Sequence, residues 1–174
     1  QMDLDDPKEF ALAKKTTDFW VNQKIVNDWS YKGYSRTGAV AMYSMLNEPE
    51  EALRQMNLYL DEYGSPNTLY IESGPVIETP ISAAASVHEM LLQSWSPDFK
   101  TDLIRLFPGV PKTWKNLSFD NLRAEGGYTV SARREAGKLI ALRIEAIADG
   151  KLDLRVKTSQ RINLVNSGAS DVVG

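Results

Sequence analysis

The strongest constraint on the fold is a change in character near residue 97 of this 174-residue chain. Before Ser96-Pro97-Asp98, apolar residues recur at the spacing of helices, whereas after it they form short runs separated by turns such as Glu125-Gly126-Gly127 and Asp149-Gly150. The strand-like runs are residues 103–107, 117–124, 128–134, 139–146, 152–157 and 162–165. We therefore predict an α+β chain, with helices in residues 1–97 and an antiparallel β-sandwich-like domain in residues 98–174.

Four helices are predicted in the first region. The first begins at Asp6-Pro7, because aspartate caps helices well and proline suits the first helical position. The third runs from Pro49 until Gly64 ends it, and both of these helices are amphipathic. The second, residues 35–46, and the fourth, residues 81–95, are apolar almost all round, so we expect protein to surround them. Two concentric layers of helices and a plain bundle would both produce this alternation.

The stretch from residue 69 to residue 95 is the part of the sequence that most resembles a catalytic pocket. Thr79 is predicted to cap the fourth helix, with Pro80 in its first position. Glu72 and Glu78 come just before this helix, at the end that a pocket would use. His88 lies on the apolar stripe of the helix, where a core histidine is favoured over a catalytic one.

Composition and charge exclude several classes of function. The formal charge is −3, from 20 basic and 23 acidic residues without long runs, which argues against a nucleic-acid partner and fits a sugar or another neutral ligand. The chain has no cysteine and one histidine, so thiol catalysis, disulfides and ordinary zinc sites are excluded. We expect no metal, no cofactor and no membrane span, since no run reaches the ~18 apolar residues that a span requires. The first residues do not have the pattern of a signal peptide.

Several motifs resemble those of glycoside hydrolase family 95, the α-L-fucosidase and α-L-galactosidase family. Ile71-Glu-Ser-Gly-Pro-Val76 and the helix ending in Glu89-Met-Leu-Leu-Gln-Ser94 resemble the last inner-helix region of that family. Tyr34-Ser35-Arg36 resembles its Trp-Ser-Arg. The segments 103–111 and 121–130 resemble two further family elements in the same order, so the resemblance covers roughly residues 28–142.

The resemblance implies the last helices of an (α/α)6 toroid followed by a C-terminal β-sandwich. It also implies a carbohydrate substrate, an inverting mechanism, a periplasmic or extracellular location, and a partner in the remainder of the chain's own polypeptide. An inverting enzyme needs two carboxyl-type groups on opposite sides of the sugar. Glu72 stands where the family has the aspartate that helps to activate water, and the general acid is expected outside this chain. Ser73-Gly74-Pro75 replaces the family's Gly-Asn-Phe.

The candidate site residues each have a structural alternative. Glu72 is a general base, or a partner of the water-activating group, or a carboxylate that binds nearby backbone. Arg36 binds sugar hydroxyls, holds a catalytic carboxylate or forms an interior ion pair. Trp29 and Tyr34 stack on sugar faces or plug helix ends, whereas Glu78 is favoured as a structural charge at a helix N-terminus. We expect the isolated chain to be inactive, and the alternative function is a non-catalytic carbohydrate-binding or interaction module.

Overall fold

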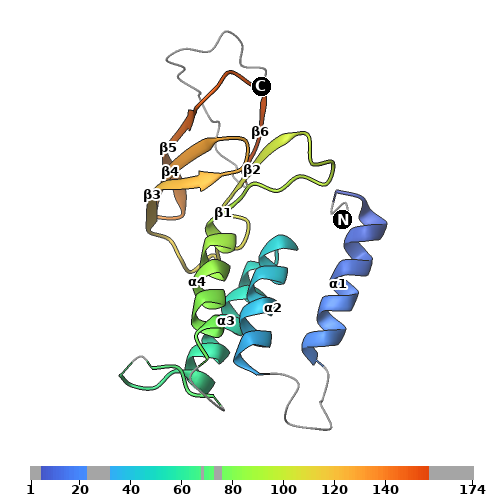
Figure 1. Ribbon diagram of the computed structural model, residues 1–174, viewed down its shortest axis with the longest axis vertical. Helices are drawn as coiled ribbons and strands as arrows, with labels where there is room; N and C mark the ends of the chain where they lie inside the picture. The colour runs from blue at the N-terminus through green and yellow to red at the C-terminus, as the bar shows by residue number, and fades with distance from the viewer. Residues whose placement is uncertain (1–4, 23–31, 68, 73–75, 157–174) are drawn as a thin grey trace.

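The computed structural model describes residues 5–22, 32–67, 69–72 and 76–156, with helices in one half and strands in the other (Figure 1). The helices are α1 (Pro7–Asn22), α2 (Gly33–Met45), α3 (Pro49–Tyr63) and α4 (Glu78–Leu91). The strands are β1 (Leu92–Gln93), β2 (Asp102–Leu106), β3 (Leu117–Ala124), β4 (Tyr128–Glu135), β5 (Lys138–Ala146) and β6 (Leu152–Val156). The α+β class is confirmed. The strand predicted at residues 162–165 lies outside the described residues.

Local sequence signals set the bounds of α1 and α3. Asp6 Oδ1 accepts hydrogen bonds from the backbone N–H groups of Lys8, at 2.7 Å, and Glu9, at 3.2 Å, so the aspartate caps α1 as expected. Pro49 occupies the first turn of α3, where a missing N–H is not needed. Gly64 follows its last residue. A cap of this kind contributes about 0.5–2 kcal/mol to helix stability.

The start of α4 differs from the prediction. The helix begins at Glu78, because the carbonyl of Ile77 already accepts the N–H of Ile81 at 3.3 Å. Thr79 therefore lies inside the first turn and does not cap it. Its side chain is fully buried, and its hydroxyl has no hydrogen-bond partner among the described residues. The helix also ends at Leu91, earlier than expected, because Leu92 enters β1.

One face of α4 is open to solvent, so the protein that is expected to surround this helix is not supplied by the described residues. Ile77 and Ile81 are 68% and 59% exposed, and Ala84, Ala85 and His88 are exposed on the same stripe. His88 is therefore not the core histidine that was predicted. The apolar pattern correctly marks a helix with two apolar faces, but only one of them has a partner within the described residues.

The helical core is built around α2, which packs against α1, α3 and α4. Ala39, Val40 and Tyr43 of α2 are almost fully buried, together with Met56 of α3 and Met90 of α4. Burying a side chain of the size of Met90 stabilises a fold by about 1.5–3 kcal/mol. Small polar residues hold α2 close to α4. They are Ser86, whose hydroxyl donates to the Thr37 carbonyl at 2.8 Å, and Ser82, whose hydroxyl forms a hydrogen bond with the Thr37 hydroxyl at 2.8 Å.

The strands form two sheets that share a second core. Sheet β3-β4-β5 is antiparallel, and the turn between β3 and β4 uses Gly126 and Gly127, both with φ near the left-handed region at 79° and 80°. The other sheet has the order β1-β2-β6. Ile104 and Leu106 of β2 belong to one buried cluster with Phe119 of β3 and Val130 of β4.

One strand pairing departs from the antiparallel prediction. β6 runs parallel to β2, with Asp102 opposite Leu152 and Leu106 opposite Val156. A parallel pair needs a long connection, which here consists of β3, β4 and β5. Trp114, which lies between β2 and β3, packs against both the helical core and the core between the strands. The division into domains at residues 1–97 and 98–174 and the (α/α)6 toroid stay predictions.

Strand β2 is tied to the end of α4 by the segment that follows it. The N–H of Phe107 donates to the Leu91 carbonyl at 2.8 Å, and the N–H of Gly109 donates to the Met90 carbonyl at 3.1 Å. Gly109 has no room for a side chain. A Cβ on this residue would lie 2.7 Å from the Ser44 Cβ and 2.9 Å from the Met90 Cα.

We expect Gly109→Ala to lower the free energy of unfolding by about 1–3 kcal/mol, because overpacking forces two helix backbones apart. Gly38→Ala is the matched control, since a Cβ there would meet only the Trp20 ring, at 3.7 Å. This control should be neutral or stabilising by up to about 1 kcal/mol, because it removes a glycine from a helix interior. Urea unfolding measures both changes, and equal values for the two variants would contradict the close packing.

Glu89 is a half-buried carboxyl group at the junction between α4 and the strands. Its Oε2 atom has no hydrogen-bond partner among the described residues. Burial raises the pKa of Glu89, the neighbouring charge of Glu125 raises it further, and His88 opposes the shift. An acid whose pKa is higher in the folded protein binds protons more readily there, so its contribution to stability is lost as the pH rises through the folded pKa.

We therefore expect Glu89→Gln to raise the melting temperature at pH 7, because the amide has the size of the carboxyl group without its charge. Below the model-peptide pKa of ~4.5 the two proteins should melt at the same temperature, since Glu89 is then neutral in both states. Thermal unfolding between these two pH values measures the difference. A variant that melts lower than the parent at pH 7 would show that the charge of Glu89 is stabilised instead.

Candidate functional site

The described site candidates lie at one end of the helices. Tyr34 and Arg36 belong to the first turn of α2, and Glu72 lies in the segment between α3 and α4. The start of α2, the end of α3 and the start of α4 all lie at the end of the helices that points away from the sheets (Figure 1). Trp29 lies outside the described residues, so the structure says nothing of its place.

Arg36 forms a forked ion pair across the helices. Its Nη2 lies 3.0 Å and 3.1 Å from the two carboxylate oxygens of Glu62, and its Nε lies 3.2 Å from one of them. Its Nη1 donates to Gln55 Oε1 at 3.1 Å. Gln55 is fully buried in α3, so the guanidinium group is held in one orientation. Arg36 therefore forms an ion pair, but its partner Glu62 is exposed, so the pair lies at the surface and not in the interior. Sugar binding by Arg36 stays a prediction.

Tyr34 presents its ring to solvent beside this ion pair. The residue is 59% exposed, while its carbonyl accepts a hydrogen bond from the Thr37 hydroxyl at 3.0 Å. Its backbone is therefore fixed at the start of α2 and its side chain is accessible. An accessible ring can stack on the C–H face of a sugar, but the structure contains no ligand that tests this role.

A cluster of three tyrosines lies next to Glu72. The ring centroids of Tyr59, Tyr63 and Tyr70 are 6.0–6.5 Å apart. Burial raises the pKa of Tyr59, and the negative charge of Glu72 raises it further, which places the carboxylate within electrostatic reach of this ring. Glu72 itself is half-buried. Tyr59 and the Tyr70 hydroxyl are buried, so the cluster packs against the helical core and does not offer these hydroxyls to a ligand.

A short backbone pairing fixes Tyr70 and thereby the chain that leads to Glu72. Gly64 and Tyr70 form an isolated antiparallel bridge, and the N–H of Ile71 donates to the Tyr63 carbonyl at 2.7 Å. The Tyr70 ring packs over Gly33, where a Cβ would lie 2.7 Å from the hydroxyl oxygen. That hydroxyl is buried and has no hydrogen-bond partner among the described residues.

The tyrosine cluster was missed as part of the site when the sequence alone was interpreted. Tyr59 and Tyr63 are spaced like core residues of an amphipathic helix, so they were assigned to packing. Gly64, which ends α3, indicates a reversal of the chain, and this reversal brings Tyr70 back toward Tyr63. Glu78 is exposed in the first turn of α4, the position expected for a charge that favours a helix N-terminus.

No group of three or more His, Cys, Asp or Glu side chains among the described residues is placed to hold a metal ion. None of the helices that the structure describes is long and apolar enough to cross a membrane.

Comparisons with known proteins identify the lineage. Residues 99–172 match the family described as "Glycoside hydrolase family 95, C-terminal domain". The Arabidopsis thaliana protein named Alpha-L-fucosidase 2 is 31% identical to this chain over 120 residues, which cover 62% of the chain and 14% of that protein. The match thus spans a small part of this relative. Residues 99–172 thus match the C-terminal domain of glycoside hydrolase family 95, and the similarity to the fucosidase supports the same C-terminal portion.

Proposed function

We propose that the chain contributes one side of the active site of an inverting glycoside hydrolase that acts on α-L-fucosides or related sugars. The observation that carries this proposal is the position of Glu72, half-buried and two residues after Tyr70 of the tyrosine cluster, at the end of the helices that points away from the sheets (Figure 1). The family match and the similarity to a protein named Alpha-L-fucosidase 2 support the class of substrate.

In this proposal Glu72 holds or orients the water that attacks the sugar. An inverting hydrolase needs a carboxyl group that protonates the leaving oxygen and a second function ~6.5–9.5 Å away that activates water on the opposite face of the ring. Glu72 supplies or assists the second function. The first comes from the remainder of the polypeptide, so the isolated chain is inactive.

The neighbouring residues support the position of the substrate. Tyr34 offers an exposed ring for the apolar face of the sugar. Arg36 is held in place by Glu62 and Gln55. In this proposal it forms part of the sugar site and donates to sugar hydroxyls through its partly exposed edge. Trp29 completes the aromatic contacts in this proposal.

The remainder of the polypeptide covers the open faces of the helices. Leu12 and Phe19 of α1 are 58% and 68% exposed, and the stripe through Ile77 and Ile81 of α4 is open as well. α1 and α4 lie at the two sides of the helical array, so both sides of it present apolar residues (Figure 1). Contiguous exposed apolar surface marks a missing partner.

We expect Glu72→Gln in the full-length enzyme to lower turnover by ~100-fold or more, because the charge that assists proton transfer is lost while size is kept. Substrate affinity should change much less. Glu78→Gln is the control and should cost far less turnover. Steady-state kinetics on an aryl α-L-fucoside measure both variants, and turnover within a factor of about three of the parent would remove Glu72 from the mechanism.

We expect Ile81→Lys to leave the thermal stability of the 174-residue chain nearly unchanged, because this side chain is exposed there. In the full-length protein the same change should lower stability by several degrees, since a charge would be buried against the covering part. Calorimetry of the two proteins measures the difference. Equal effects in both would show that α4 has no covering partner.

A further inference from the structure

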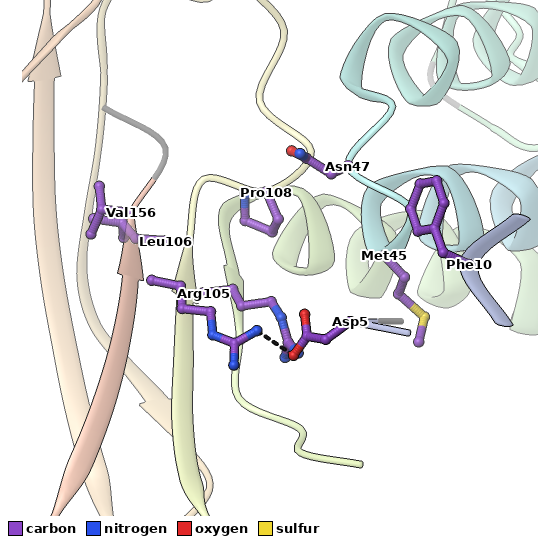
Figure 2. Close-up of a pocket in the computed structure, with 9 residues that line it drawn as sticks. Asp5, Phe10, Met45, Asn47, Arg105, Leu106, Pro108 and Val156 are labelled. Carbon is purple, nitrogen blue, oxygen red and sulfur yellow. Dashed lines mark hydrogen bonds and ion pairs between the residues drawn. The ribbon is translucent and has the colours of Figure 1, made fainter. Parts of the chain in front are cut away.

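A second cleft lies at the other end of the helices, where they meet the strands. It has a volume of about 320 Å³ and lies between the start of α1, the end of α2, and strands β2 and β6 (Figure 2). Tyr34 and Met45 mark the two ends of α2, which has 13 residues and a length of roughly 20 Å. The cleft is therefore separate from the site around Glu72.

The lining of the cleft has the composition of a small-molecule site. Its walls are apolar side chains, with a few charged and polar groups between them. The apolar residues are Phe10, Met45, Leu106, Pro108 and Val156, and the polar ones are Asp5, Asn47, Arg105 and Arg155. Ligand sites commonly have volumes of ~300–1,000 Å³, apolar walls and a few convergent polar groups, and they often lie between structural units.

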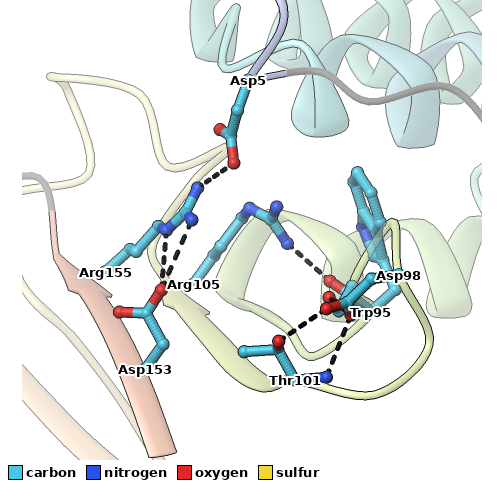
Figure 3. Close-up of polar contacts among 8 residues, drawn as sticks. Asp5, Trp95, Asp98, Thr101, Arg105, Asp153 and Arg155 are labelled. Atoms are coloured by element: carbon cyan, nitrogen blue, oxygen red, sulfur yellow. Dashed lines mark hydrogen bonds and ion pairs between the residues drawn. The ribbon is translucent and has the colours of Figure 1, made fainter.

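The guanidinium groups of Arg105 and Arg155 are held in place by neighbouring groups. Arg105 donates to the Trp95 carbonyl at 2.7 Å and lies over the Trp95 ring, 4.3 Å from its centroid (Figure 3). Arg155 lies 3.4 Å from Asp153, two residues away on β6. Because each side chain is anchored by its own sheet or by the loop beside it, little freedom is lost when a ligand arrives.

The contact with Asp5 shows that Arg155 binds a carboxylate in this cleft. The Asp5 carboxylate lies 2.5 Å from Nη1 of Arg155, and it comes from the chain just before α1, not from the sheet (Figure 3). Arginine forks match planar carboxylates in particular. The side chains of Asp5 and Arg155 are 52% and 43% exposed, and ion pairs this exposed contribute little to stability. A competing carboxylate can therefore displace Asp5 at low cost.

We propose that this cleft is a second binding site, for a small molecule bearing one carboxylate, and that Asp5 occupies the carboxylate position in the free protein. When Asp5 moves aside, the carboxylate of the ligand takes its place opposite Arg155. The body of the ligand then contacts Phe10, Leu106 and Val156.

The test is a titration of the 174-residue chain with benzoate, cyclohexanecarboxylate and D-glucuronate, followed by amide chemical shifts. At least one of them should perturb the backbone signals of Leu106 and Val156, whereas D-glucose and benzyl alcohol should not. If none of the three carboxylates perturbs these signals at millimolar concentration, the proposal is wrong. If inorganic phosphate binds as tightly as the best carboxylate, the site accepts anions in general and the carboxylate assignment is wrong.

Substitutions on the two sides of the ion pair should act in opposite directions. Arg155→Gln should weaken binding by about tenfold or more, because a charge-assisted hydrogen bond is lost. Asp5→Asn should strengthen it by about two- to fivefold, because the competing charge is removed. Arg143→Gln, an exposed arginine on β5, is the matched control and should leave affinity unchanged.

Circular dichroism identifies a variant that fails to fold. If Arg155→Gln does not fold, Arg155→Lys, which keeps the charge and loses the planar fork, should weaken binding by about threefold or more. Binding that is unchanged or weaker in folded Asp5→Asn would overturn the role of Asp5 as an occupant of the site.

Discussion

The close approach of the chain after β2 to the last turn of α4 is the contact on which the described architecture depends. Gly109 lies against Ser44 and the Met90 backbone, and two backbone hydrogen bonds join this segment to the carbonyls of Met90 and Leu91. These bonds satisfy acceptors at a helix end that would otherwise be left unpaired inside the protein. They also fix the direction in which β2 leaves the helices. The position of the core between the strands follows from that direction, and so does the position of the cleft lined by Arg105 and Arg155.

Much of the fold could be predicted from the sequence where the determining signal is local. The turn glycines Gly126 and Gly127 and the alternation within β3, β4 and β5 set strand bounds that agree with the prediction to within a residue. Asp6 and Pro49 likewise mark the starts of α1 and α3. The Thr79 cap was wrong because the backbone at Ile77 is already helical, and composition at Thr79 does not report the conformation of the residue before it.

The candidate site was less accessible to prediction because its contacts are distant in the sequence. Arg36 and Glu62 are 26 residues apart, and no periodicity links them. The exposure of His88 could not be predicted from the apolar stripe alone, since the stripe indicates that a helix needs a partner and not which part of the polypeptide supplies it. The parallel pairing of β2 with β6 could not be predicted either. The two strands are neighbours in one sheet, but the three strands between them in the sequence form the other sheet.

This parallel pairing has a consequence for the order in which the protein matures during synthesis. β1 pairs with only Arg105 and Leu106, so most of β2 relies on β6 for its backbone hydrogen bonds. On the ribosome β2 emerges well before Leu152, and until then this apolar strand presents an unpaired edge. Unpaired strand edges are the surfaces at which nascent chains aggregate or are bound by chaperones. If synthesis stops within β5, the released chain can therefore fold its helices, but the edge of β2 stays unpaired and can bind other chains.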